Sequence, residues 1–380
     1  MNDSSTDRVT REFVALPSAT APRAGVGGHP CQGVYYRPVG HEPRTALIAT
    51  HYNIDFSEHY LAEFIAERGL GFLGWNTRFR GGEPYFLADL ALADIDVGVR
   101  WLRGQGVDCV VLLGNSGGGS LMATYQAQAT APNLVPEYSR RSLSPAIDDL
   151  AGGDLYVSIV AHTGRAEVLT NWMDPSVTDE NDPLSVDSAL DPYAADRQPP
   201  FDPVFIGAYR NAQRARNDRI TAWCKDELDR LSAAGHRERL FVVPRLWADL
   251  RMLDGSIDPS RRAVPGCYLG DPRRANYGIF GVGTVSSLRT WLSMWSLSDS
   301  QCSTDQARHI TLPALVIDAD ADTGIFSCDT AKIVDALRGR PGAPHVPMHS
   351  IAGDHYLADP PGARAEAADL ITDWVRSHTS

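Results

Sequence analysis

One short segment of the chain concentrates glycine around a single hydroxyl group. Residues 110–120 read VVLLGNSGGGS, in which Ser116 is followed by three glycines and preceded, two residues earlier, by Gly114. Glycine permits sharp turns and close backbone contacts that other residues block. An apolar strand, then G-x-S-x-G, then a helix is the arrangement of a nucleophile elbow, which exposes a serine hydroxyl. The segment therefore favours Ser116 as a catalytic nucleophile.

Two other glycine-rich motifs fit this segment less well. A phosphate-binding P-loop requires Lys followed by Ser or Thr after its glycines, whereas Ser120 and Leu121 stand there. A dinucleotide-binding fingerprint requires G-x-G-x-x-G, and these glycines do not have that spacing. We therefore expect no nucleotide at this turn, and the sequence implies neither an organic cofactor nor a metal ion.

A serine nucleophile needs a histidine base and a carboxylate that orients the base. In this architecture they follow the serine in the order acid, then histidine. His355, in AGDHYL, comes directly after a predicted strand and is the expected base. The segment LVIDADADTGIF offers three candidate acids. We favour Asp322, because Asp318 lies closest to the strand and should contact its neighbours; Asp320 is the second choice.

Two alternatives remain for these carboxylates. The three aspartates could begin a calcium-binding loop, but Thr323 and Asp329 stand at the sixth and twelfth positions, and a strand precedes them instead of a helix. Calcium is therefore disfavoured. A carboxylate after the strand expected at 154–162, such as Glu167 or Asp174, is a less favoured substitute for the orienting acid.

Short apolar runs alternate with amphipathic helical patterns on both sides of a long middle segment. The expected strands lie at 44–51, 70–75, 108–114, 154–162, 312–320 and 346–353, with one or two more before residue 44. The expected helices lie around 60–65, at 86–103, from the glycines to about 128, at 327–338 and near the C-terminus. Such alternation is typical of a mainly parallel sheet covered by helices. Ser57 is expected to cap the first helix.

The alternation stops between residues 163 and 307. This part is rich in Pro, Trp, Tyr, Phe and Arg and contains helical patterns such as 203–234. A structureless loop of this length would be unusual in a compact domain. We therefore expect a mainly helical cap at 163–307, inserted into a core that residues 1–162 and 308–380 form together.

Composition and charge limit the partners. The 380 residues carry a formal net charge of −12, whereas proteins that bind nucleic acids concentrate Lys and Arg. The six cysteines lack metal-binding spacing and are expected to be reduced thiols. The sequence shows neither an apolar signal segment nor about 18 consecutive apolar residues. We expect a cytoplasmic protein that binds a small molecule and neither nucleic acid nor membrane; a homodimer is left open.

GNSGG at 114–118, Asp322 and GDH at 353–355, taken in this order, resemble the α/β-hydrolase superfamily. The resemblance covers most of the expected core. It implies an eight-stranded, mainly parallel sheet with helices on both faces and the cap after the sixth strand. It also implies Ser116 as the nucleophile, His355 as general base and then acid, and Asp322 as the carboxylate that orients the histidine.

The same resemblance implies an oxyanion hole made of two backbone N–H groups. Gly117 supplies one, and the turn after the strand at 44–51 supplies the other, which alignment of the turn assigns to Asn53. Tyr52 stands where the superfamily usually has glycine, so its side chain can shape the pocket instead. His51 is interpreted as structural.

Substrate choice is expected to depend on the cap. Its many aromatic residues suggest an aromatic-walled pocket for a bulky, uncharged ester or lactone, although each residue alone fits core packing as well. The cap aromatics include Trp247 and Tyr268, and the expected substrate contacts are Tyr52, Trp172, Tyr209, Tyr277 and Tyr356. Cap and elbow also resemble bacterial lactonases that open the macrocyclic lactone zearalenone. The alternatives are an acyltransferase with the same triad and a ligand-binding protein on a hydrolase fold.

Overall fold

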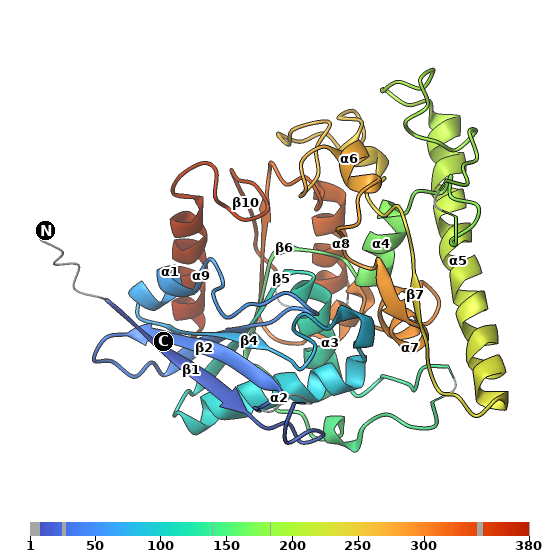
Figure 1. Cartoon of the computed structure of the whole chain (residues 1–380). Helices are drawn as coiled ribbons and strands as arrows, with labels where there is room; N and C mark the ends of the chain where they lie inside the picture. The colour runs from blue at the N-terminus through green and yellow to red at the C-terminus, as the bar shows by residue number, and fades with distance from the viewer. Residues whose placement is uncertain (1–7, 25–27, 139, 183, 340–344, 380) are drawn as a thin grey trace, which may run out of the picture.

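An eight-stranded sheet forms the centre of the structure, a computed structural model that describes residues 8–24, 28–138, 140–182, 184–339 and 345–379. The strands lie in the order β1-β2-β4-β3-β5-β6-β9-β10 (Figure 1). β2 is antiparallel to β1 and β4, and all other neighbours are parallel. The expected mainly parallel sheet is confirmed. The strands are β1 (Val9–Leu16), β2 (Cys31–Pro38), β3 (Thr45–Ala49), β4 (Gly71–Asn76), β5 (Cys109–Ser116), β6 (Leu155–Ala161), β9 (Ala314–Ala319) and β10 (Met348–Ile351).

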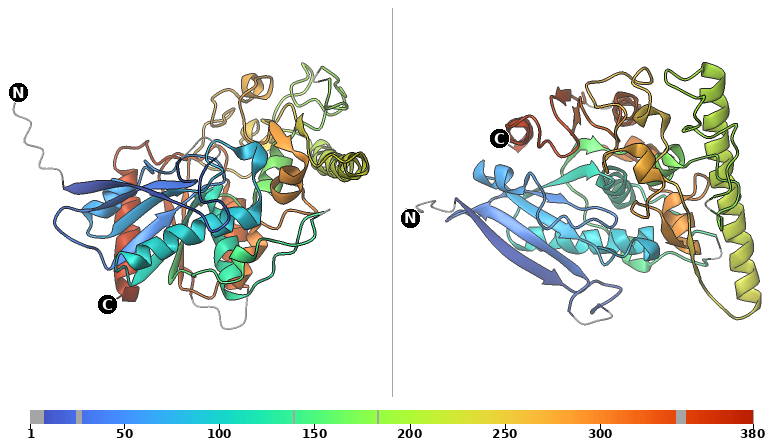
Figure 2. Two further views of the ribbon diagram at one scale, coloured as in Figure 1. Left: turned by 60° about the horizontal axis from the view of Figure 1, so that its bottom comes forward. Right: turned by 45° about the horizontal axis from the view of Figure 1, so that its top comes forward.

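Helices cover both faces of this sheet (Figures 1 and 2). One face carries α1 (Ala62–Glu67) and α9 (Ala363–Thr379), and the other carries α2 (Ala88–Gly104), α3 (Gly118–Thr130) and α8 (Ser327–Arg338). Successive strand residues point to opposite faces. In β3, Leu47 therefore belongs to the core under α1 and α9, whereas Ile48 belongs to the core under α2 and α3.

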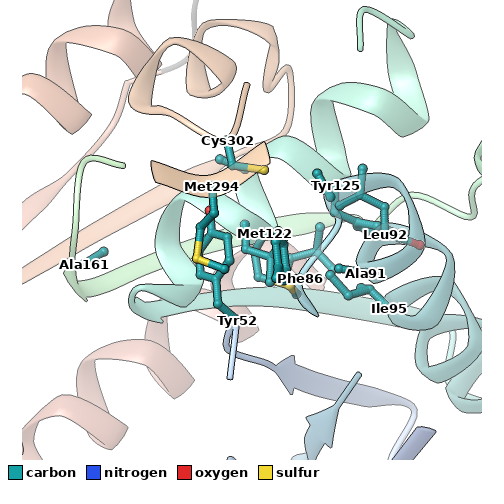
Figure 3. Close-up of a cluster of buried hydrophobic side chains, with 14 of the residues drawn as sticks. Tyr52, Phe86, Ala91, Leu92, Ile95, Met122, Tyr125, Ala161, Met294 and Cys302 are labelled. Carbon is teal, nitrogen blue, oxygen red and sulfur yellow. The ribbon is translucent and has the colours of Figure 1, made fainter. Parts of the chain in front are cut away.

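Helix α2 is buried on its polar side as well as its apolar side. Asp89 pairs with Arg140 at 2.7 Å, and Asp94 pairs with Arg78 at 2.6 Å. Both aspartates are fully buried, so each needs such a partner. Figure 3 shows the neighbouring apolar core, where α2, α3 and the turn after β3 meet residues from the later part of the chain. The labelled side chains are Tyr52, Phe86, Ala91, Leu92, Ile95, Met122, Tyr125, Ala161, Met294 and Cys302.

Between β6 and β9 the chain leaves the sheet. The described part of residues 163–307 adds no strand to the eight-stranded sheet. It forms α4 (Arg165–Trp172), α5 (Pro203–Ala233), α6 (Pro272–Asn276) and α7 (Leu288–Thr290). It also forms a two-stranded antiparallel sheet of β7 (Leu240–Val242) and β8 (Val285–Ser287), which the sequence did not predict. Short helical turns lie in this part of the chain at Leu250–Met252, Trp291–Trp295 and Thr304–His309. Two more precede it, at Glu83–Tyr85 and Pro145–Ile147.

Helix α5 extends over 31 residues along the side of the molecule away from β1 and β2 (Figure 1). It begins where the Asp202 side chain accepts hydrogen bonds from the amides of Val204 and Phe205, with Pro203 in the first turn. Its bounds match the helical pattern predicted at 203–234. Neither α5 nor any other helix in the described part of the chain combines the length and the apolar composition of a bilayer span.

The prediction that Ser57 caps the first helix is wrong. Helix α1 begins at Ala62, and no side chain caps it. The Ser57 hydroxyl instead accepts a hydrogen bond from Asn76 Nδ2 at 2.8 Å, and the Ser57 amide donates to Asp55 Oδ1 at 2.8 Å. Serine favours such local turn contacts as readily as a helix cap.

Candidate active site

Ser116 occupies a sharp turn between strand and helix. It is the last residue of β5, and α3 begins two residues later at Gly118. Its φ of 53° lies in the left-handed region that non-glycine residues rarely adopt. The register between β5 and β6 shifts at this point, and the Ser116 carbonyl accepts a hydrogen bond from the His162 amide at 2.9 Å. The expected elbow geometry is therefore present around Ser116.

Three of the glycines near Ser116 are required by close packing. A Cβ on Gly118 would stand 2.1 Å from the carbonyl oxygen of Thr50, and one on Gly119 would stand 2.6 Å from Cβ of Ala161. A Cβ on Gly114 would approach Cα of Gly119 to 2.8 Å. These contacts let α3 pack directly against β3 and β6, which fixes the position of the serine at the start of the helix.

Asn115 anchors the elbow from within the sheet. Its Nδ2 donates to the carbonyl of Ile159 and to the hydroxyl of Tyr60, both at 3.0 Å. Its Oδ1 lies 3.2 Å from His59 Nε2, and His59 Nδ1 accepts the Leu61 amide at 3.2 Å. Burial lowers the pKa of His59 to about 3, so the ring is neutral. The residue before the nucleophile is thus held by three partners.

His355 and Asp322 meet Ser116 in the expected order. Nε2 of His355 lies 3.1 Å from Oγ of Ser116, and Nδ1 lies 2.7 Å from Oδ2 of Asp322. The other oxygen of Asp322 accepts the amides of Gly324 at 2.7 Å and Ile325 at 3.0 Å. Asp322 is 2% exposed and His355 7%. This geometry allows His355 to accept a proton from Ser116 while Asp322 holds the ring in place.

The other candidate acids have different contacts. Asp320 accepts the Gly353 amide at 3.2 Å and pairs with Arg261 at 3.1 Å. Asp318 lies inside β9, where burial raises its pKa. Asp174 is fully buried and pairs with Arg245 at 2.5 Å.

Glu167, the remaining substitute acid, pairs with Lys332 in α8. Asp322 is therefore the carboxylate that contacts Nδ1 of His355.

Tyr268 joins the acid and the base, a contact that the sequence did not single out. Its hydroxyl donates to Oδ1 of Asp322 at 3.2 Å and lies 3.0 Å from Nδ1 of His355. Its ring centroid is 4.3 Å from that of His355. Burial, followed by the charge of Asp322, raises the pKa of Tyr268 well above its usual value, so the hydroxyl stays protonated. The only signal in the sequence was its membership of the aromatic set in the insertion.

An aromatic cluster of four residues, Trp172, Trp247, Tyr268 and Tyr356, reaches the histidine through Tyr268 and Tyr356. Trp172 stacks on Trp247 at 4.7 Å and meets Tyr268 edge-on at 5.9 Å. The half-exposed Tyr356 lies 5.0 Å from the His355 ring. Of the predicted substrate contacts, Tyr356 thus lies beside His355, and the buried Trp172 packs against Tyr268.

The other three predicted substrate contacts are engaged differently. Tyr52 is fully buried, and its hydroxyl lies 3.0 Å from Oγ of Ser120 (Figure 3). Tyr209 is fully buried in α5 and donates to the carbonyl of Ala248 at 2.6 Å. The exposed Tyr277 accepts from Arg245 at 3.1 Å. These contacts are core packing and support of an ion pair, and the substrate contacts expected of these three side chains stay predictions.

The predicted oxyanion donors differ in their surroundings. Gly117 is the N-cap residue directly before α3, at the end of the helix where backbone N–H groups have no partner within the helix. The amide of Asn53 instead donates to Nδ1 of His51 at 3.3 Å, and the amide of Ile54 does so at 3.2 Å. Burial lowers the pKa of His51 well below its usual value, with Arg165 as the next contribution. His51 is thus neutral, and its Nδ1 accepts a hydrogen bond from the Asn53 amide, which was expected to face the substrate.

No group of three or more His, Cys, Asp or Glu side chains in the described ranges could hold a metal ion. All six cysteines are free thiols.

No protein-family model matches the chain, and no curated protein matches its sequence. Solved structures match in fold. The structure of DcsB in complex with its substrate analogue is 12% identical, covers 97% of this chain and 99% of its own, and gives a TM-score of 0.53. A monoacylglycerol lipase from Paleococcus ferrophilus is 14% identical, with 97% and 99% coverage and a TM-score of 0.46.

Brefeldin A esterase, described as a bacterial homologue of human hormone-sensitive lipase, is 11% identical. It covers 98% of this chain and 78% of its own, with a TM-score of 0.47. Identities this low bear on the fold alone. The chain has the α/β-hydrolase fold, a mostly parallel eight-stranded sheet with helices on both faces and a sharp turn at Ser116 after the fifth strand.

Proposed function

We propose that the protein is a serine hydrolase that cleaves a carboxylic ester or lactone. The observation that carries the proposal is the hydrogen-bonded line from Ser116 Oγ through His355 to Asp322, with distances of 3.1 and 2.7 Å. The strained backbone at Ser116 supports the same role, because such strain is concentrated at functional sites. The fold alone hosts many chemistries, so the proposal depends on these three side chains.

In the acylation step, Ser116 Oγ attacks the carbonyl carbon of the ester as its proton moves to Nε2 of His355. Asp322, bonded to Nδ1, keeps the ring oriented and stabilises the imidazolium that forms. The carbonyl oxygen becomes an oxyanion, which the Gly117 amide at the N-terminus of α3 can stabilise. The bond to the leaving oxygen then breaks, and His355 returns the proton to that oxygen.

In the deacylation step, His355 takes a proton from water, which attacks the acyl carbon bound to Ser116. The same tetrahedral geometry forms and collapses, and Oγ recovers its proton from His355. A lactone would open to a hydroxy acid by these two steps, with the net addition of one water. An added alcohol or amine in place of water would give the acyltransferase alternative.

The substrate side of the proposal rests on the aromatic cluster. Tyr268 and the half-exposed Tyr356 lie against His355, and the buried Trp172 and Trp247 pack against Tyr268. Aromatic walls favour a large apolar substrate with few charges. We propose a bulky ester or macrocyclic lactone, with zearalenone as the compound to test first.

The test is mass spectrometry of products from zearalenone, an aliphatic lactone, a linear aryl ester and a short peptide. Wild type is compared with Ser116→Ala and with Ser120→Ala, a matched control that removes a hydroxyl from the same glycine-rich segment. We expect gain of one water on at least one ester or lactone, loss of it in Ser116→Ala, and retention in Ser120→Ala.

Labelling with a fluorophosphonate provides a second readout that does not depend on the substrate. An adduct mapped to Ser116 supports the nucleophile, whereas its absence in folded protein favours the ligand-binding alternative. Turnover in Ser116→Ala would remove this serine from the mechanism. Turnover of the linear ester alone would keep the chemistry and reject the macrocyclic substrate.

A further inference from the structure

The turn after β3 does not present its expected amide to the substrate. The Asn53 amide donates to Nδ1 of His51 at 3.3 Å, so it cannot also point at an oxyanion. Hydrolases of this type stabilise the oxyanion with more than one preorganised donor, because each donor contributes strongly in a site that excludes water. Gly117 supplies one amide, and a second donor has to come from another part of the chain.

Two side-chain nitrogens lie directly beside Gly117. A Cβ on this glycine would stand 2.6 Å from Nε2 of His51 and 3.1 Å from Nη1 of Arg165. Any larger residue would displace one or both. His51 comes from the turn after β3, and Arg165 is the first residue of α4, after β6. Nδ1 of His51 accepts two amides, so its proton is on Nε2, the nitrogen that faces Gly117.

Arg165 has more donors than partners. It is 2% exposed. Its Nη2 lies 3.4 Å from Oδ1 of Asn53 and 3.6 Å from Oε1 of Glu83, which are long contacts. Its Nε is buried without a hydrogen bond, and the hydrogen bond that it makes to Asn53 uses Nη2 and not Nη1. A buried guanidinium with unused N–H groups is costly unless a ligand supplies an acceptor.

The guanidinium is held rigidly in this position. It lies over the ring of Tyr52 at 5.2 Å and over the ring of Trp295 at 5.1 Å. Both rings are fully buried, and the Tyr52 hydroxyl is itself bonded to Ser120. Burial lowers the pKa of Arg165, yet an arginine keeps its charge at neutral pH. A fixed, charged donor beside Gly117, the residue after Ser116, is an arrangement that stabilises developing negative charge.

We propose that Arg165 is a catalytic residue whose Nη1 donates to the acyl oxygen of the bound ester as that oxygen becomes the oxyanion. This inference rests on the proposed ester hydrolysis. The bond from Ser116 Oγ to the acyl carbon forms, the π electron pair of the carbonyl moves to its oxygen, and the serine proton passes to His355. Arg165 keeps all its protons. The N–H on Nε2 of His51 lies beside Gly117 as well.

The experiment compares an ester with its thiono analogue, in which sulfur replaces the carbonyl oxygen. Sulfur is a poor hydrogen-bond acceptor, so wild type should strongly prefer the oxygen ester. Arg165→Met keeps the length of the side chain between the two rings but has no donor. We expect kcat/KM for the oxygen ester to fall about 100- to 1000-fold, with a much smaller change for the thiono ester. Arg165→Lys should recover part of the preference.

The controls separate this inference from the proposed function. If wild type neither reacts with a fluorophosphonate nor hydrolyses the ester, the proposed function fails and the inference with it. Suppose that wild type is active and that thermal unfolding shows both variants to be folded. If their activity toward the oxygen ester and the thiono ester then falls equally, Arg165 is structural and the inference alone is overturned. A loss seen only in KM, and only for esters that carry a carboxylate, also overturns it, because Arg165 would then bind a substrate anion.

Discussion

The hydroxyl of Tyr268 lies 3.0 Å from Nδ1 of His355, although the two residues are 87 positions apart in the chain. The same hydroxyl donates to Oδ1 of Asp322 at 3.2 Å. Tyr268 thus comes from the insertion between β6 and β9 but stabilises the acid of the core. The insertion contributes to the positioning of the acid–base pair as well as to the surroundings of the substrate.

Removal of this hydroxyl should slow turnover without disrupting the fold. A hydrogen bond to a charged group contributes about 1.5 to 3 kcal/mol, so Tyr268→Phe should lower kcat about tenfold or more, with little change in KM. Tyr356→Phe is the matched control, because this half-exposed tyrosine also lies beside His355, with 5.0 Å between the ring centroids. Equal kcat values for the two variants would show that the Tyr268 hydroxyl does not act on the triad.

The roles of Asp322 and Asp320 can be distinguished by replacing each of them with asparagine. In Asp322→Asn the amide disturbs the tautomer of His355, and kcat should fall on the order of 10³- to 10⁴-fold. In Asp320→Asn the remaining oxygen can still accept the Gly353 amide, and only the exposed pair with Arg261 is lost. We expect less than about a tenfold loss there, given the small contribution of exposed ion pairs. A larger loss in Asp320→Asn would reassign the acid.

The core and the three central side chains could be predicted because local patterns determine them. The G-x-S-x-G turn follows the buried strand β5, and Asp322 and His355 follow β9 and β10, which are parallel to it, so that the carboxyl ends of all three strands lie at one edge of the sheet. The contacts of Tyr268 and Arg165 could not be predicted in this way. They depend on how the insertion packs on the core, and nothing in the spacing of Pro, Trp and Tyr specifies that packing.

The assignment of Asn53 shows the same limit in a short segment. Alignment of the turn predicted where the Asn53 amide lies but not the direction in which its N–H points. In the structure this N–H donates to Nδ1 of His51. The β7–β8 sheet was missed because each strand has only three residues, too few for an alternating pattern to appear.

Two glycine substitutions should have opposite effects on stability. In Gly118→Ala the new Cβ would stand 2.1 Å from the Thr50 carbonyl, which is backbone and cannot move aside. We expect a loss of about 3 kcal/mol or more in the free energy of unfolding, or no folded protein. Gly104, the last residue of α2, has nothing within 4 Å of such a Cβ, so Gly104→Ala should stabilise by up to about 1 kcal/mol. Urea unfolding monitored by circular dichroism measures both.

The neutral, buried His59 should make the protein less stable in acid. Burial lowers its pKa to about 3 in the folded protein, whereas an unfolded histidine titrates near 6.5. Below about pH 6.5 the unfolded chain therefore binds a proton that the folded chain does not, and the free energy of unfolding falls as the pH falls toward the folded pKa. Between about pH 6.5 and pH 5 this single group should remove about 2 kcal/mol.

Comparison of wild type with His59→Gln at about pH 7.5 and about pH 5 isolates this contribution. Glutamine keeps an N–H near Oδ1 of Asn115, the 3.2 Å contact that His59 makes, but does not titrate. The variant should be less stable than wild type at the higher pH, since it loses the ring stacked on Tyr60 at 4.5 Å. Its additional loss at the lower pH should be about 2 kcal/mol smaller than that of wild type. Equal losses in the two proteins would mean that His59 is protonated in the folded state, and the anchoring of Asn115 behind Ser116 would then need a different account.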